Sequence, residues 1–140
     1  MLGKQRLTAF VATAQPKRAR QFYRDALGLR LVSDDQFAVV FDCAGVQLRI
    51  QKVEKLQPHP FTSLGWQVAD IRASVTRLVT RGVSFERYSF MDQDKLGIWQ
   101  SPSGAKVAWF KDPDGNLLSL TEIGTVRRRS TKRSASHRTR

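Results

Sequence analysis

The sequence predicts an α+β fold made of two βαβββ modules, in residues 5–54 and 61–122, followed by a basic tail over residues 125–140. Two observations support this prediction. Strand-like and helix-like segments follow the same order in both halves, and short motifs fall at matching places in each half. A chain of 140 residues also falls within the usual size of one domain. We therefore expect one domain, residues 1–124, with an internal repeat.

The first module is predicted from its apolar alternation and its turn residues. Residues 5–13 alternate as a strand does, and Pro16 then begins a helix at a position where its missing N–H costs nothing. Gly28 should end that helix. Three short β-like runs follow, over residues 29–32, 37–42 and 46–53.

The second module begins after a linker that contains Pro58 and Pro60. We expect Asp70 to cap a helix that Gly82 ends. Strands are expected over residues 61–68, 83–88, 98–100, 106–110 and 116–121, and residues 89–97 are expected to form a loop.

The two halves can be laid over each other. Thr8 falls on Ser63, and the Asp42–Gly45 turn falls on Asp112–Gly115. The offset is 55 at the start (63 minus 8) and 70 at the end (115 minus 45), so the second half holds a longer insertion. This agreement favours a repeated module over two unrelated halves.

Three motifs resemble those of one known family, the vicinal-oxygen-chelate superfamily, also called the glyoxalase, bleomycin-resistance and extradiol-dioxygenase type. Pro16–Leu29, with Phe22-Tyr23 and a Leu-Gly stop, resembles the first helix of these proteins. Val68–Ile71 with Gly82-Val83 is similar to their second helix, and Phe110–Asn116 resembles the hairpin before their last strand. The resemblance covers residues 5–122 in the right order.

The resemblance implies that the curved sheets form an open cup, which a second chain commonly completes. We therefore expect a homodimer. In the enzymes of the superfamily, a divalent metal sits in the cup, held by His or Glu from the first and last strands of the modules. The metal binds two substrate oxygens and stabilises the species that develops there.

The usual metal-ligand positions fall on Thr8, Arg49, Ser63 and Ser119. Such a site needs imidazole or carboxylate ligands. A small alignment slip does not supply them, because residues 5–14, 61–68 and 116–121 contain no His, Asp, Glu or Cys. We expect no metal and no cofactor, and whether the protein is an enzyme stays open.

Strand parity predicts which side chains line the cup instead. Leu48 and Ile50 should face the helix, which sends Arg49 to the cup. The predicted ligand-binding residues are Thr8, Phe10, Gln47, Arg49, Gln51, Ser63, Gln67, Trp99 and Ser119.

Two of these positions leave alternatives open. A guanidinium in a concave site matches a carboxylate or phosphate, but the alternative that Arg49 pairs with a neighbouring acid or reaches solvent is kept open. Trp99 and Trp109 are candidates either for stacking on a ligand or for the core. Trp66 is expected in the core.

The formal charge of +12 is concentrated at one end. Seven of the 24 basic residues fall within the last fourteen positions, which contain no acid, so subtracting seven leaves +5 for residues 1–126. The tail has too few apolar residues to offset the entropy of ordering and is expected to be disordered. Weak nonspecific binding to nucleic acid is one expectation for it.

Three functions remain on this evidence. The first is a small-molecule-binding protein, similar to bleomycin-resistance proteins, with an aromatic or oxygen-rich anionic ligand. The second is a lyase, isomerase or dioxygenase of the superfamily with an atypical site, and the third is a nucleic-acid-associated protein. One cysteine, no leader-like N-terminus and no long apolar run favour a cytoplasmic protein without a membrane partner.

Overall fold

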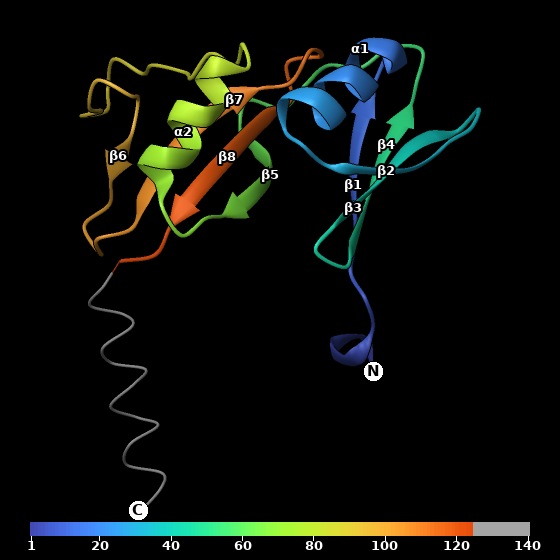
Figure 1. Ribbon diagram of the computed structural model, residues 1–140, viewed down its shortest axis with the longest axis horizontal. Coiled ribbons are helices and arrows are strands. Elements are labelled where there is room, and N and C mark those ends of the chain that lie inside the picture. Colours follow the sequence, from blue (N-terminus) through green and yellow to red (C-terminus); the bar gives the residue numbers. More distant parts are fainter. Residues whose placement is uncertain (125–140) are drawn as a thin grey trace, which may run out of the picture.

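The computed structural model describes residues 1–124 and contains two four-stranded mixed sheets. The strand orders are β1-β4-β3-β2 and β5-β8-β7-β6. Figure 1 shows the sheets side by side, with helix α1 over the first and α2 over the second. The expected tail, residues 125–140, lies outside the described residues.

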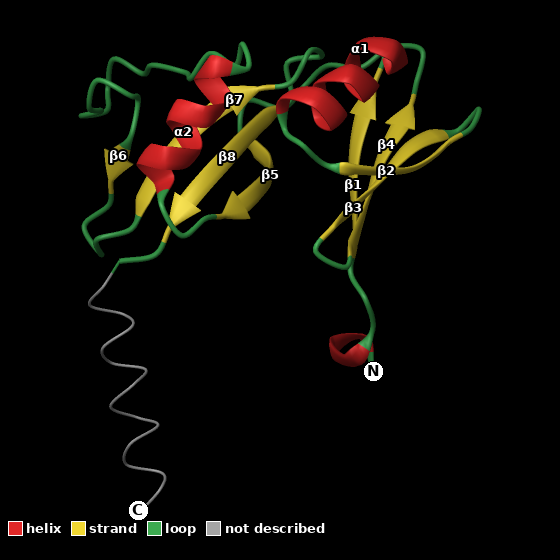
Figure 2. Ribbon diagram, viewed as in Figure 1, coloured by secondary structure: helices red, strands yellow, loops and turns green. Residues whose placement is uncertain are grey.

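The first module has the predicted βαβββ order (Figure 2). A short 3-10 turn, η1 (Leu2–Lys4), precedes it. Its elements are β1 (Thr8–Thr13), α1 (Pro16–Gln21), η2 (Phe22–Ala26), β2 (Arg30–Asp34), β3 (Ala38–Cys43) and β4 (Val46–Lys52). Pro16 begins the helix, as expected from its fixed φ and missing N–H.

The first helix changes character halfway along. We expected one helix from Pro16 to Gly28, but its second part, η2, is a π-helix in which the Leu27 N–H donates to the Phe22 carbonyl. Between its start and its glycine, this helix has one residue more than α2, since Pro16 to Gly28 is twelve steps and Ile71 to Gly82 is eleven. A π-turn takes up one additional residue without breaking the helix.

The second module comprises β5 (Thr62–Gln67), α2 (Ile71–Thr80), β6 (Trp99–Gln100), β7 (Lys106–Lys111) and β8 (Leu117–Glu122). Asp70 caps α2 by accepting a hydrogen bond from the Ala73 N–H. The strand expected over residues 83–88 was wrong. That segment makes only a single bridge, from Phe85 to Phe110. A side chain, Gln93, rather than a neighbouring strand takes the Tyr88 N–H, so no ladder extends.

The register confirms the internal repeat in detail. Phe10 pairs with Arg49 on β1 and β4, and Gly65 pairs with Ser119 on β5 and β8. The two pairs are related by the same offsets of 55 and 70 that the sequence motifs give (65 minus 10; 119 minus 49). The two modules therefore repeat at the level of individual strand pairs.

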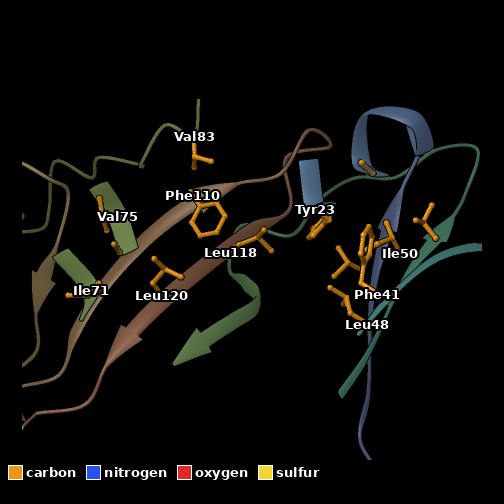
Figure 3. Packing of buried hydrophobic residues seen from close by; sticks show 14 of the residues in the cluster. Tyr23, Phe41, Leu48, Ile50, Ile71, Val75, Val83, Phe110, Leu118 and Leu120 are labelled. Atoms are coloured by element: carbon orange, nitrogen blue, oxygen red, sulfur yellow. The ribbon is translucent and has the colours of Figure 1, made fainter. Parts of the chain in front are cut away.

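One core joins both modules (Figure 3). Phe41, Leu48 and Ile50 fill it from the first sheet, while Phe110 and Leu118 fill it from the second. Tyr23 of η2 is fully buried and lies between the two groups (Figure 3). Its ring packs at 6.0 Å from that of Phe41, measured between centroids. Trp66 packs against this core, as predicted.

Polar contacts also fix the modules to each other. Asn116, just before β8, donates a hydrogen bond to the Ala12 carbonyl of β1, and Asp114 accepts one from the Ala14 N–H. The sequence identified Asp112–Gly115 only as a turn, but its side chains reach the first module. β1 and β5 are thus held as the neighbouring edges of the two sheets.

Among residues 1–124, no helix combines the length and apolar character that crossing a membrane requires.

Candidate functional site

Each sheet has one side covered by helices and one side free of them, which we call the helix-free face. On the first sheet the register pairs Thr8 with Gln47, Phe10 with Arg49, and Ala12 with Gln51. Residues paired across a ladder share a face. The alternate residues are Val11, Leu48 and Ile50, which are buried in the core. The helix-free face therefore gathers five of the predicted residues, namely Thr8, Phe10, Gln47, Arg49 and Gln51.

The second sheet continues the same face. Gly65 pairs with Ser119, and Ser119 pairs with Trp109. One row further, Gln67 pairs with Thr121. Arg49 and Phe10 form one cross-strand row in the first sheet, and Gly65, Ser119 and Trp109 form the corresponding row in the second, with β1 and β5 as neighbouring edges.

Ser63 departs from the simple alternation. The ladder shifts between Thr62 and Leu64, so Thr62 takes the place opposite Leu117 that Ser63 would hold in a regular strand. Ser63 is exposed in this irregularity and has no ladder partner. Bulges re-aim side chains locally, and nothing in the residue types of this segment announces one.

Aromatic rings gather on the helix-free face of the second sheet. The rings of Trp99 and Trp109 lie 6.1 Å apart between centroids, and Tyr88 meets Trp109 edge-on at 5.8 Å. Phe90 lies 5.5 Å from Tyr88 and is 79% exposed. These four residues, here called the aromatic platform, offer large flat surfaces on which a planar ligand can stack. Trp99 and Trp109 do not belong to the core, because the core cluster and the partly buried residues packed against it include Trp66 but neither of these two.

The loop that carries Tyr88 and Phe90 is held by one amide side chain. Gln93 accepts from the Tyr88 N–H at 2.8 Å and donates to the carbonyls of Glu86 and Gly97 at 3.0 and 2.8 Å. Asp94 completes the loop by accepting from the backbone N–H groups of Leu96 and Ile98. The platform is therefore positioned before any ligand arrives.

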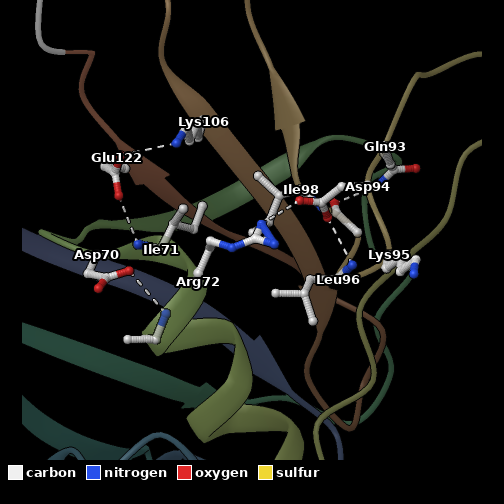
Figure 4. A network of polar contacts seen from close by, with 12 residues as sticks. Asp70, Ile71, Arg72, Gln93, Asp94, Lys95, Leu96, Ile98, Lys106 and Glu122 are labelled. Atoms are coloured by element: carbon white, nitrogen blue, oxygen red, sulfur yellow. Dashed lines mark hydrogen bonds and ion pairs between the residues drawn. The ribbon is translucent and has the colours of Figure 1, made fainter.

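Figure 4 shows how this loop meets α2. Arg72 of α2 pairs with Asp94 at 2.9 Å, while Glu122 of β8 accepts from the Ile71 N–H at the start of the helix. Glu122 also lies 3.9 Å from Lys106. Since Glu122 points to the helix side, as its strand parity predicts, it is a capping residue and not part of the helix-free face.

Arg49 has no carboxylate partner among the described residues. None of the ion pairs within residues 1–124 includes it. Its charge reaches Asp35, whose pKa is lowered chiefly by the backbone N–H groups of Phe37 and Ala38, with a smaller contribution from Arg49. Arg49 is partly buried and pairs in register with the exposed Phe10. Its hydrogen-bonding capacity is thus available to a ligand.

The residues present do not fit the divalent metal of the superfamily's enzymes. The matching positions hold three hydroxyls and a guanidinium, at Thr8, Ser63, Ser119 and Arg49. Neutral hydroxyls are weak ligands, and a guanidinium repels a cation. Within residues 1–124, moreover, His, Cys, Asp and Glu nowhere form a group of three that could hold a metal ion.

Cys43 is equally unsuited to chemistry. Burial raises the pKa of its thiol, and the hydrogen bond with Trp66 only partly opposes this rise. A thiol with a raised pKa is a poor nucleophile at neutral pH. Cys43 therefore serves as a small apolar contact between the modules.

In a single chain the helix-free face is an open surface with shallow relief. A hollow of about 190 Å³ lies beside Thr8 and Gln47, with Arg6 and Asp42 also on its rim. Gln51, Ser63 and Gln67 are exposed, as is 59% of Phe10. Sequence reasoning did not place Tyr88 or Phe90 among the predicted ligand-binding residues; it considered Tyr88 only as a possible acid or base. The closely spaced aromatics of residues 85–90 were the available signal.

Comparisons with known proteins agree with this fold. The family described as the Glyoxalase/Bleomycin resistance protein/Dioxygenase superfamily matches residues 6–120. A superfamily member from Sphaerobacter thermophilus superposes with a TM-score of 0.68 at 24% identity, covering 87% of this chain and 99% of that one. A member from Nocardioides gives 0.66 at 18% identity, covering 85% and 83%.

A third structure, lactoylglutathione lyase from Agrobacterium tumefaciens, gives a TM-score of 0.60 at 20% identity, covering 85% of this chain and 93% of that one. A search of curated protein sequences found no match. The fold and its register define a protein of paired βαβββ modules. The chain belongs to the glyoxalase/bleomycin resistance protein/dioxygenase superfamily.

Proposed function

We propose that the protein binds a small aromatic, oxygen-rich or anionic molecule on its helix-free face without metal-assisted chemistry, in the manner of a bleomycin-resistance protein. The observation that carries the proposal is the Trp99–Trp109 pair, which lies on that face with its rings 6.1 Å apart. Partly exposed tryptophans with ordered neighbours offer contact area at little entropic cost.

Arg49 supplies the polar half of this proposed site. It lies on the helix-free face of the first sheet and lacks an acidic partner among the described residues. A planar guanidinium can hold a carboxylate or phosphate with two parallel hydrogen bonds. Burial, followed by the charge of Glu86, raises the pKa of Tyr88. Its hydroxyl therefore stays a donor at neutral pH.

We further propose that a second copy of the chain covers this face. One chain leaves Phe10 and several polar side chains exposed there, whereas small-molecule sites commonly enclose most of the ligand's surface. A homodimer closed over this face would supply the missing wall. Light scattering of the wild type and of Phe10→Ser measures this, with the wild type expected as a dimer and the variant shifted toward monomer. A monomeric wild type would contradict the proposal.

Tryptophan fluorescence is the direct test of binding. A panel of aromatic acids and phosphates is titrated into the wild type, into Arg49→Met and into Trp99→Leu. We expect saturable quenching in the wild type. Arg49→Met should bind an acidic ligand ten to more than a hundred times more weakly, as expected for the loss of about 1.5–3 kcal/mol of hydrogen bonding to a charged group. Arg49→Lys should recover only part of this.

The control is Arg20→Met, a change in α1 on the helix-covered side that removes the same charge from a side chain paired with Asp34. It should bind as the wild type does. Equal affinity in Arg49→Met and the wild type would remove Arg49 from the site, and equal quenching in Trp99→Leu would remove the platform.

A further inference from the structure

A hollow of about 650 Å³ lies on the helix-covered side of the molecule, between α2 and the end of η2. We call it the interhelix groove. One wall is formed by Ala73 and Arg77 of α2 together with Arg81, which follows that helix, and the other is formed by Leu27 and Leu29. Because the first module supplies one wall and the second module the other, the groove exists only when both modules are folded together.

The floor of the groove is apolar. Trp66, Phe110 and Leu120 form it, since strand alternation turns these residues of β5, β7 and β8 toward the helices. Val68 continues the floor where β5 ends. Trp66 and Val68 are only partly buried by the rest of the chain. A ligand lying here would remove further apolar area from water, worth about 25 cal/mol for each Å².

Two cations stand over one end of this floor. Arg77 lies in the last turn of α2, Arg81 is the residue that follows the helix, and both line the groove. Like charges repel each other, and within residues 1–124 neither guanidinium is part of an ion pair. With the part of the chain that the structure describes, the Arg81 guanidinium makes one long hydrogen bond, of 3.4 Å, to the Ala26 carbonyl. The carbonyl groups at the C-terminal end of α2 carry partial negative charge, which favours nearby cations. This partial charge is smaller than that of a carboxylate, so it does not neutralise two guanidinium groups.

The acidic group of the groove is at its other end. Asp70 precedes α2 and is already used as the cap of that helix. Ten residues of helix separate it from Arg81, about 15 Å along the axis. The groove is therefore polarised, with an apolar floor, a cationic end and an acid far from the cations.

We propose that the interhelix groove is a second ligand site, which binds an amphipathic monoanion. A flat aromatic or short aliphatic body would lie on the Trp66 floor, and one carboxylate or sulfonate would be held between Arg77 and Arg81. The volume is within the range typical of small-molecule sites, about 300–1,000 Å³. This site lies on the opposite side of the second sheet from the aromatic platform and does not depend on the function proposed above.

The probe for the test is 2-naphthoate, titrated into the full chain and followed by amide chemical-shift changes. We expect saturable shifts at Ala73, Arg77 and Val68. The variant Arg77→Gln/Arg81→Gln should bind at least about tenfold more weakly, the factor for one lost charge-assisted hydrogen bond. The uncharged 2-naphthamide should bind the wild type more weakly by a similar factor.

The matched control is Lys17→Gln/Arg18→Gln, which removes two positive charges from exposed positions of α1 outside the groove. It should bind naphthoate as the wild type does. A second variant, Ala73→Trp, fills the groove from an exposed helix position and should abolish the shifts without removing charge.

Three results would overturn the proposal: no saturable shift at millimolar naphthoate, equal affinity in the arginine double variant and its control, or shifts confined to Ser119 and Trp109. The last result would place naphthoate on the helix-free face instead. Arg49→Met separates the two sites, because it should weaken ligands of the helix-free face and leave the groove shifts unchanged.

Discussion

The hydroxyl of Tyr23 donates a hydrogen bond of 2.7 Å to the carboxylate of Asp112, across the boundary between the two modules. Both residues are buried. Burial is the main reason that the pKa of each group is raised, and the charge of Asp112 raises that of Tyr23 further. Asn116 donates to the same carboxylate through its side-chain and backbone N–H groups. This carboxylate therefore lies at the centre of the contact between the modules.

Tyr23→Phe should destabilise the protein by about 1.5–3 kcal/mol, because it keeps the ring in the core but removes a donor to a buried carboxylate. Urea unfolding measures the difference. Tyr88→Phe is the control, since its hydroxyl makes no hydrogen bond with the described residues and its loss should change stability by less than about 0.5 kcal/mol. A Tyr23→Phe protein as stable as the wild type would show that the hydrogen bond contributes nothing net.

Asp34→Asn should make stability less dependent on acid pH. Lys52 at 2.6 Å and Arg20 at 2.9 Å bond to Asp34. The pKa of Asp34 is lowered mainly by the Lys52 hydrogen bond, against the opposing effect of desolvation, with Arg20 adding to the lowering. An acid with a lowered folded pKa contributes stability above its unfolded pKa of about 3.9 and loses it as pH falls through the folded value.

The wild type should therefore exceed Asp34→Asn by about 0.5–1 kcal/mol at pH 7, with the difference vanishing near pH 2. Unfolding curves across this pH range measure it. Gln36→Ala, at an exposed position that carries no titratable group, should differ from the wild type by the same amount at both pH values. A wild-type advantage that persists at pH 2 would mean that packing, not charge, distinguishes the variant.

Gly65→Ala should destabilise the protein because a Cβ at this position would lie 2.6 Å from the Ser119 Oγ. Ser119 is only 8% exposed, so its hydroxyl has little room to move. We expect a cost of about 1–3 kcal/mol, typical of overpacking. Thermal unfolding of Gly65→Ala, Ser119→Ala and the double variant measures the coupling. The double variant should be more stable than Gly65→Ala alone, and strict additivity would contradict a steric cause.

Gln93→Ala should loosen the loop that carries Tyr88 and Phe90, since three hydrogen bonds to its backbone are lost together. Amide hydrogen exchange at Tyr88 and Ile98 is the measurement, and both should exchange faster than in the wild type. Gln36→Ala, at an exposed position in the first module, should leave these rates unchanged. Unchanged exchange in Gln93→Ala would mean that Asp94 alone holds the loop.

Sequence reasoning reached the repeat because it depends on local pattern. Alternation along β4 predicts that Arg49 points to the face of the sheet away from the buried Leu48 and Ile50. The strand register agrees with that prediction. Sequence reasoning could not find the irregularity at Ser63, since a bulge depends on how two strands meet and not on residue type. The strand expected over residues 83–88 does not form, for a related reason. Apolar residues do alternate there, but the Gln93 side chain accepts the hydrogen bond of the Tyr88 N–H that a neighbouring strand would otherwise take.

Contacts between residues far apart in the chain could not be predicted from the sequence either. Asp112 has the local character of a turn residue, and its partner Tyr23 is 89 positions away. The interhelix groove likewise has walls from both modules, so neither half predicts it. Both features arise from how the modules meet, which local patterns do not encode.

The Tyr23–Asp112 bond has no counterpart on the other side of the repeat. Counted from the helix starts at Pro16 and Ile71, the residue that matches Tyr23 is Leu78, and the turn residue that matches Asp112 is Asp42, which meets Arg30 at the surface. Two copies of the first module would place a second buried tyrosine hydroxyl opposite Asp42, and two copies of the second would leave a buried acid facing leucine. The two halves are consequently not interchangeable at this boundary, although they share strand order and register.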